Sequence, residues 1–153
     1  MSTVSARRLL ADASVAEAEA LWYALERRPT FIDGFARLDV AEGGWPQPAG
    51  RIVWSSPPSG RGRVVERVTG HEPGASQAAS VEDGGMWATQ TVRFAARGEA
   101  CEITLELDYR LKREGVAGVL ADVIYFRRRL RASIERTLTR FAIELAAERE
   151  LHS

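Results

Sequence analysis

The strongest constraint on the fold is the strict alternation of apolar and polar side chains from Cys101 to Lys112. A period of two places successive side chains on opposite faces of a strand, so this segment has one apolar face and one wet face. The apolar positions are Ile103, Leu105, Leu107, Tyr109 and Leu111. A sheet with one apolar face must be covered by another layer, which predicts a two-layer α+β domain.

The covering element is the segment from about Val116 to Glu148, which predicts a helix of roughly 50 Å at 1.5 Å per residue. Its apolar side chains recur at steps of three, four or seven residues and form one stripe. They are Val116, Leu120, Val123, Leu130, Ile134, Leu138, Phe141 and Leu145. This stripe predicts that one face of the helix lies on the sheet.

Most of the chain before this helix shows the period of two that is typical of strands, and Gly or Pro interrupts it where hairpins need special backbone angles. A short strand is expected first, at Val4–Ala11. Six further strands are predicted at Ala36–Ala41, Arg51–Ser55, Arg61–Gly70, Ser76–Glu82, Met86–Ala95 and Cys101–Lys112. The short connections between consecutive strands imply an antiparallel meander.

A helix between the first two strands is expected to begin at a capping box formed by Ser14 and Glu17. It is expected to end at Arg28 and Pro29, because proline interrupts a helix, and residues 30–34 leave room for one more turn. Together these elements predict one helix-grip domain over residues 1–153. A curved antiparallel sheet of about seven strands would wrap around the long C-terminal helix, with short helices after the first strand and a ligand cavity inside.

The composition narrows the range of partners. Acidic and basic residues number 21 each, so the overall charge gives no reason to expect a polyanionic partner. Arg127, Arg128, Arg129 and Arg131 form a basic run, but they spread around the helix, which favours a solvated face over a nucleic-acid site. We find no signal-peptide pattern and no apolar run of the roughly 18 residues that a membrane span needs. A cytoplasmic protein, monomeric or homodimeric, is the expectation.

Sites for metals and for nucleophilic catalysis are not expected. Cys101 is the only cysteine, and His71 and His152 are the only histidines, so the usual ligand spacings for a metal are missing. There is neither a phosphate-binding glycine-rich loop nor a Gly-x-Ser-x-Gly turn for a nucleophilic serine. The sequence therefore implies no cofactor.

Several short segments resemble the START-like superfamily, and more narrowly the bacterial polyketide cyclase/dehydratase and lipid-transport branch, often labelled SRPBCC. These segments are ASVAE at 13–17, FIDGF at 31–35, GRVVERV at 62–68, DGGM at 83–86 and LELDY at 105–109. The resemblance covers nearly the whole chain and implies a deep hydrophobic cavity. Members of the superfamily carry lipids, bind hormones, cyclise polyketides or assist other proteins, so the resemblance assigns no catalytic residue.

Polar side chains on the predicted apolar faces are the candidate functional groups, because their burial needs a reason. Arg127 lies in the stripe of the long helix, where it could fix an anionic ligand group, snorkel to a rim, or pair with an internal carboxylate. Glu66 shares the face of Val64 and Val68. It could be a general base or the structural partner of Arg127, or it could face solvent if a bulge shifts the register.

Four other residues complete the predicted ligand site. Gln90 has the parity of apolar neighbours in its strand, so its amide is expected to point inward, toward a ligand or a core partner. Trp54 and Tyr109 could form aromatic walls, and Tyr109 adds a hydroxyl. Val123, on the long helix, would supply apolar contact.

Three functions are compatible with this pattern. The first is a carrier or sequestering protein for a small, largely apolar molecule, which could be a lipid, a polyketide or an aromatic compound with an anionic or hydroxyl group. The second is a polyketide or aromatic cyclase or dehydratase, in which Glu66 would move protons and Arg127 would stabilise an enolate. The third is a protein-interaction module.

Overall fold

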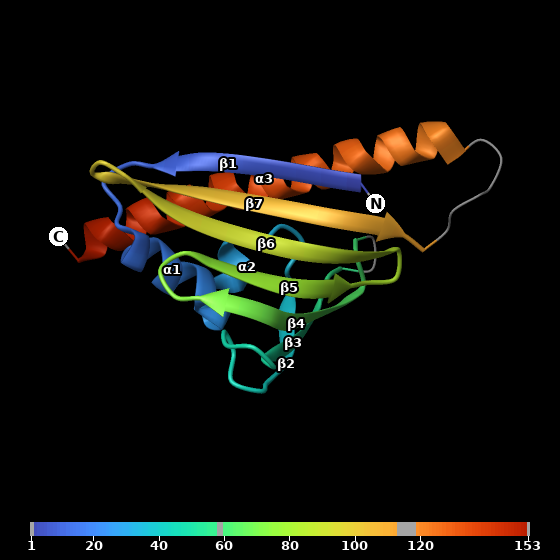
Figure 1. The fold of residues 1–153 in the computed structure, drawn as a ribbon, viewed down its shortest axis with the longest axis horizontal. Coiled ribbons are helices and arrows are strands. Elements are labelled where there is room, and N and C mark those ends of the chain that lie inside the picture. Colours follow the sequence, from blue (N-terminus) through green and yellow to red (C-terminus); the bar gives the residue numbers. More distant parts are fainter. Residues whose placement is uncertain (1, 58–59, 113–118, 153) are drawn as a thin grey trace.

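The computed structural model describes residues 2–57, 60–112 and 119–152, the side chains of 119–122 excepted. Its seven strands form one antiparallel sheet in the order β1-β7-β6-β5-β4-β3-β2 (Figure 1). The strands are β1 Ser2–Leu10, β2 Arg37–Glu42, β3 Arg51–Ser55, β4 Arg63–Glu72, β5 Ser76–Glu82, β6 Met86–Arg97 and β7 Ala100–Leu111. The predicted antiparallel sheet of seven strands is therefore confirmed; β2 to β7 form the meander, and β1 pairs with β7 at its edge.

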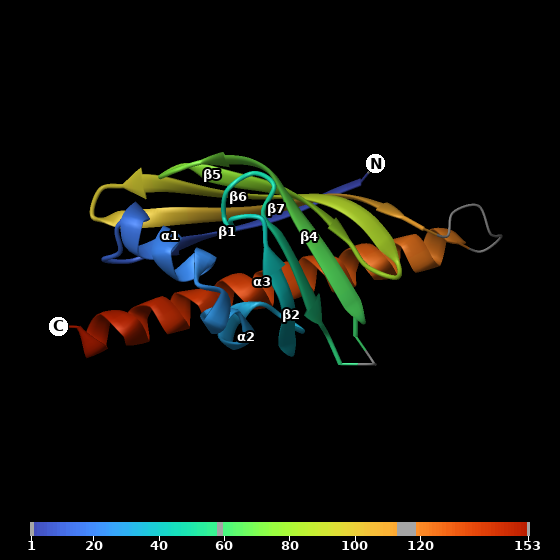
Figure 2. The same ribbon diagram turned by 90° about the horizontal axis from the view of Figure 1, so that it is seen from below.

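The long helix α3, Val119–Leu151, lies along the concave face of the curved sheet (Figure 2). The predicted start of this helix, at residues 116–118, falls outside the described residues. Five members of the predicted stripe are buried against the sheet and the short helices. They are Leu130, Ile134, Leu138, Phe141 and Leu145. The sequence thus predicted both the helix-grip fold and the face of α3 that holds it together.

The short helices differ from the prediction. The capping box is present, because Ser14 Oγ accepts from the Glu17 amide at 3.0 Å and the Glu17 side chain accepts from the Ser14 amide at 3.1 Å. However, α1 spans only Val15–Tyr23 and stops at Ala24, whose backbone is extended. Pro29 begins rather than ends a helix, since it lies in the first turn of α2, where no amide hydrogen is needed.

The chain between α1 and α2 makes one tight helical turn, Leu25–Arg27, and α2 itself is a single turn, Arg28–Phe31. This turn directs Arg28 and Phe31 inward, and both are fully buried. The break in the predicted helix therefore has a consequence for the interior, because it places a guanidinium group inside the domain.

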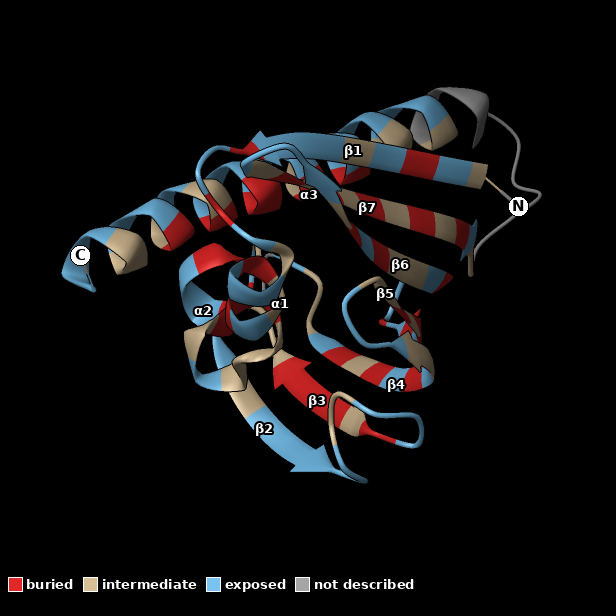
Figure 3. Cartoon of the chain, turned by 60° about the vertical axis from the view of Figure 1, so that its left-hand side comes forward, coloured by how far each residue is buried: buried red, intermediate tan, exposed pale blue. Residues whose placement is uncertain are grey.

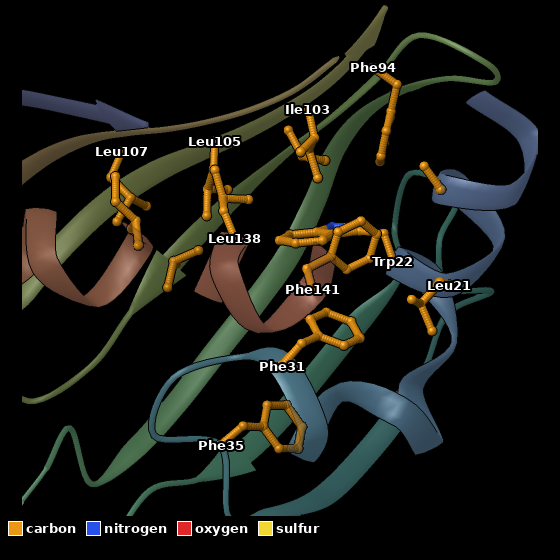
Figure 4. Close-up of a cluster of buried hydrophobic side chains, with 14 of the residues drawn as sticks. Leu21, Trp22, Phe31, Phe35, Phe94, Ile103, Leu105, Leu107, Leu138 and Phe141 are labelled. Atoms are coloured by element: carbon orange, nitrogen blue, oxygen red, sulfur yellow. The ribbon is translucent and has the colours of Figure 1, made fainter. Parts of the chain in front are cut away.

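The core is most tightly packed where α1 and α2 meet the second half of α3 (Figure 4). The rings of Trp22, Phe31 and Phe141 contact one another at centroid distances of 5.1 to 5.5 Å. Burial alternates along β7 as the sequence predicted, whereas the edge strand β2 is mostly exposed (Figure 3). We call this tightly packed end of the molecule the closed end.

The opposite end is packed less tightly. Val123 and Phe126, on the first half of α3, are only half-buried, whereas Phe141 at the closed end is fully buried. The β3–β4 and β5–β6 connections also lie at this end, near the beginning of α3 (Figure 1). We call it the open end.

Candidate functional site

A pocket of about 360 Å³ lies at the open end, between the β3–β4 and β5–β6 connections, the loop after α2 and the first half of α3. We call it the end pocket. This volume is within the range of small-molecule sites. Its apolar wall consists of Met86, Phe126 and Leu130, and the Phe126 ring lies 5.7 Å from that of Tyr109. The end pocket therefore borders the concave face of the sheet, on which Tyr109 lies.

One side of the end pocket is held by an ion pair between its two hairpin connections. Arg61 Nε donates to Asp83 Oδ2 at 2.8 Å, and the Arg61 guanidinium lies 5.3 Å from the centre of a Trp54 ring. Asp83 Oδ1 accepts from the amides of Gly85 and Met86, at 2.8 and 3.0 Å. This local turn, typical of Asp followed by Gly, fixes the carboxylate that orients Arg61.

The other side is organised by Asp33, which joins the loop after α2 to α3. Its carboxylate accepts from Ser133 at 2.7 Å, from Arg136 at 3.0 and 3.2 Å, and from Arg140 at 3.2 Å. Burial tends to raise the pKa of Asp33, but the hydrogen bonds from Arg136 and Ser133 outweigh it, so the pKa is below its ordinary value.

Glu66 lies further inside, and its side chain is only 2% exposed. Its Oε2 accepts from Trp54 Nε1 at 2.6 Å and lies 3.7 Å from Nη1 of the fully buried Arg28. The suggestion that Glu66 pairs with Arg127 is therefore wrong, because the turn at the start of α2 places Arg28 beside Glu66 instead. Burial lowers the pKa of Arg28, and the charge of Glu66 opposes that shift.

Tyr109 and Glu66 belong to one row of side chains across the concave face. Tyr109, Ala88, Val81 and Glu66 are successive cross-strand neighbours on four strands, which separates the two end residues by roughly 14 Å. The Tyr109 hydroxyl and Glu66 Oε1 are buried without a hydrogen-bond partner among the described residues. Between these polar groups the row contains only the side chains of Ala88 and Val81.

The six predicted ligand contacts divide into two groups. Trp54, Glu66 and Tyr109 are buried on the concave face, and Gln90 lies on the same face, half-buried, beside Ala79 and Leu107. The helix residues Val123 and Arg127 are half-buried on α3. Arg127 makes no hydrogen bond or ion pair with the described part of the chain, and the α3 side chains that line the end pocket are its neighbours Phe126, Arg129 and Leu130, with Ser133 and Arg136 further along.

Sequence reasoning missed Arg28, Arg61 and Arg129. Arg28 was interpreted only as part of a helix end, and Arg61 as the beginning of a strand. Arg129 belongs to the basic run for which the sequence predicts a solvated face; it is exposed, and it also lines the end pocket. The available signal for Arg61 was its position beside Gly60 and Gly62, because such a turn can bring an arginine to the rim of a cavity.

A second hollow, of about 440 Å³, lies between α1 and the C-terminal half of α3. Its arginines are already paired, Arg27 with Glu144 and Glu148, and Arg149 with Glu17. Because it lies outside the sheet's concave face and both of its arginines are already in ion pairs, we place the candidate site in the smaller end pocket.

Comparison with known families identifies the group of proteins to which the fold belongs. The model of the family described as polyketide cyclase/dehydrase and lipid transport matches residues 1–146. The chain belongs to this family. The predicted START-like relationship is confirmed, and the family accounts for the helix-grip architecture. No curated protein that was compared with the chain matches it.

Solved structures agree on the fold. A protein of Thermus thermophilus is 21% identical, with a TM-score of 0.75 and coverage of 96% of this chain and 99% of that one. Ara h 8.0201 is 9% identical, with a TM-score of 0.71 and coverage of 95% and 98%. Norcoclaurine synthase from Thalictrum flavum is 12% identical, with a TM-score of 0.64 and 92% coverage of each chain. At these identities the likeness shows the fold alone.

Two further findings concern the described residues only. No group of three or more His, Cys, Asp or Glu side chains among them is placed to hold a metal ion. No helix among them is long and apolar enough to cross a membrane.

Proposed function

We propose that the protein binds a small, largely apolar molecule, with an anionic or hydroxyl group, between its sheet and α3 and acts as a carrier or sequestering protein. The observation that carries this proposal is the end pocket, which combines an apolar wall of Met86, Phe126 and Leu130 with arginine side chains. A site that is mainly apolar and has a few fixed polar groups is typical of small-molecule binding. The family's description, which includes lipid transport, supports the same function.

The residues predicted from the sequence extend this proposal into the interior. Gln90 and the Tyr109 hydroxyl lie on the concave face. There they would contact the part of the ligand that extends beyond the end pocket, into the space between the sheet and α3. Val123 and Arg127, half-buried on the same half of α3, would contact the ligand from the helix side. Cytoplasmic location and a monomeric or homodimeric state remain predictions from the sequence.

The direct test is native mass spectrometry of the purified protein, together with thermal unfolding in the presence of apolar carboxylic acids and alcohols. We expect a retained small molecule or a rise in the unfolding temperature. If no molecule is retained and no compound of either class raises this temperature, the binding function is contradicted. Recovery of a stoichiometric protein partner without any small ligand would instead favour the interaction-module alternative.

A cyclase or dehydratase remains the second candidate, because Glu66 is buried on the concave face, its Oε1 has no hydrogen-bond partner among the described residues, and the family's description includes polyketide cyclases. In that mechanism Glu66 would transfer protons. Glu66→Gln should then abolish turnover of a poly-β-keto substrate while the protein remains folded. Unchanged turnover in this variant would exclude Glu66 as the catalytic base.

A further inference from the structure

The carboxylate oxygens of the end pocket already accept hydrogen bonds. Both oxygens of Asp33 accept hydrogen bonds, from Ser133, Arg136 and Arg140. Both oxygens of Asp83 also accept, one from Arg61 and the other from two backbone amides. The Ser133 hydroxyl donates its hydrogen to Asp33. Every carboxylate oxygen of the described lining therefore already accepts at least one hydrogen bond, and both oxygens of Asp33 accept two.

Donors, in contrast, are in surplus. Arg61 Nη2 is buried and has no hydrogen-bond partner among the described residues, although Arg61 lines the end pocket. Arg129 lines it too and has no ion pair in the described part of the chain, where its guanidinium lies 5.7 Å from the Tyr125 ring centre. The described lining contains three arginines and two aspartates, which leaves one positive charge unmatched.

A ligand group that complements this surplus must accept hydrogen bonds and carry negative charge. A carboxylate does both, and its two oxygens match the planar donors of a guanidinium group. An alcohol needs an acceptor for its own hydrogen, and each aspartate oxygen of the described lining already accepts from a protein donor. A carboxylate that reaches Arg61 Nη2 supplies the acceptor that this donor lacks among the described residues of the ligand-free protein.

We propose that the end pocket selects ligands with an oxyanion head group, a carboxylate above all, and that Arg61 and Arg129 are the residues that determine this selectivity. The apolar part of the ligand lies against Met86, Phe126 and Leu130. This inference rests on the proposed binding function and narrows its choice between an anionic and a hydroxyl group to the anionic one.

Calorimetric titration with decanoate and with decanol, which share a ten-carbon chain length, tests the proposal. Wild-type protein should bind decanoate at least about tenfold more tightly, as expected for a charge-assisted hydrogen bond. Arg129→Gln and Arg61→Gln should each weaken decanoate binding about tenfold and leave decanol binding unchanged. The matched control is Arg128→Gln, because Arg128 is exposed like Arg129 but is not among the side chains that line the pocket. This variant should change neither affinity.

The outcomes separate the proposal from the function on which it rests. Equal affinity for decanoate and decanol would overturn the oxyanion selectivity and leave the binding function standing. Equal losses in the Arg128→Gln and Arg129→Gln proteins would overturn the assignment of Arg129, because they would indicate a general charge effect. Absence of binding by both compounds would contradict the binding function itself. If Arg61→Gln fails to fold, Arg61→Lys keeps the charge opposite Asp83 and should still lose selectivity, because lysine lacks the planar fork.

Discussion

Glu66 and Arg28 form the buried charge pair of this domain, and each depends on the other. Glu66 also accepts from Trp54, whereas the Arg28 Nη1 and Nη2 atoms have no hydrogen-bond partner in the described structure. Arg28 Nε donates to the Trp22 carbonyl at 3.3 Å, and the guanidinium lies 4.9 Å from the Trp45 ring centre. Removing one member would leave the other charge buried without compensation.

We therefore predict that Arg28→Met lowers the free energy of unfolding by about 3–5 kcal/mol. The double variant Arg28→Met with Glu66→Gln should recover most of that loss, since the amide still accepts from Trp54. Urea unfolding measures both. The control is Arg27→Met, a half-exposed neighbour that pairs with two glutamates, which should cost about 1 kcal/mol or less. Equal losses for Arg27→Met and Arg28→Met would refute the importance of the buried pair.

Tyr109 gives a second prediction at the residue scale. Its hydroxyl is buried without a partner among the described residues, so Tyr109→Phe should change the free energy of unfolding by less than about 0.5 kcal/mol or raise it. Urea unfolding of the ligand-free protein is the measurement. A loss of more than about 1 kcal/mol would mean that this hydroxyl is satisfied in the native protein.

Among the elements, those with regular side-chain periods were predictable and the junctions were not. Arg51–Ser55 and Ser76–Glu82 have the predicted bounds, because the alternation inside each strand and the turn residues at its ends point the same way. The end of α1 was not predicted because Ala24 is neither a glycine nor a proline, and nothing else in the sequence indicates that a helix ends there. The break depends on tertiary packing, which draws Arg28 and Phe31 inward.

The same reasoning explains what could be foreseen of the site. The inward direction of Trp54, Glu66 and Tyr109 follows from the period of two within each strand, which is a local property. The end pocket instead joins Asp33, Arg61, Asp83 and Arg129 from separate connections and a helix. Their proximity depends on how the sheet curves and where the helix begins. Neither property can be predicted from the local order of side chains.

Asp33 links the loop after α2 to α3, so its substitution tests how much this link between elements contributes to stability. Its folded pKa is lowered by Arg136 and Ser133 despite burial, so its contribution to stability is complete above its ordinary pKa of about 4. That contribution is lost as the pH falls through the lower folded pKa. Asp33→Asn should cost about 1–2 kcal/mol at pH 7 and less at pH 3. Urea unfolding at both pH values tests this, and an equal cost at pH 3 and pH 7 would contradict it.

At the scale of the whole molecule, the closed end and the open end of the domain differ in packing and in function. The aromatic contacts among Trp22, Phe31 and Phe141 hold the closed end together, and the hollow of about 440 Å³ at that end lies between α1 and α3 and is not lined by the sheet. The open end leaves about 360 Å³ between α3 and the hairpin connections of the sheet. A ligand that binds only the folded protein should stabilise it by about 2.7 kcal/mol at a concentration one hundred times its dissociation constant. Stability that rises with ligand concentration is thus expected from this architecture.

The most direct test of this account uses Met86, which lines the end pocket and is one of only two methionines, the other being Met1. Protein labelled with ¹³C at the methionine methyl groups should give two resonances, and Met86→Leu identifies the one from the pocket. Titration with decanoate should shift the Met86 resonance progressively to saturation. Saturable decanoate binding that leaves the Met86 resonance unchanged would show that the ligand binds elsewhere and would contradict the assignment of the end pocket.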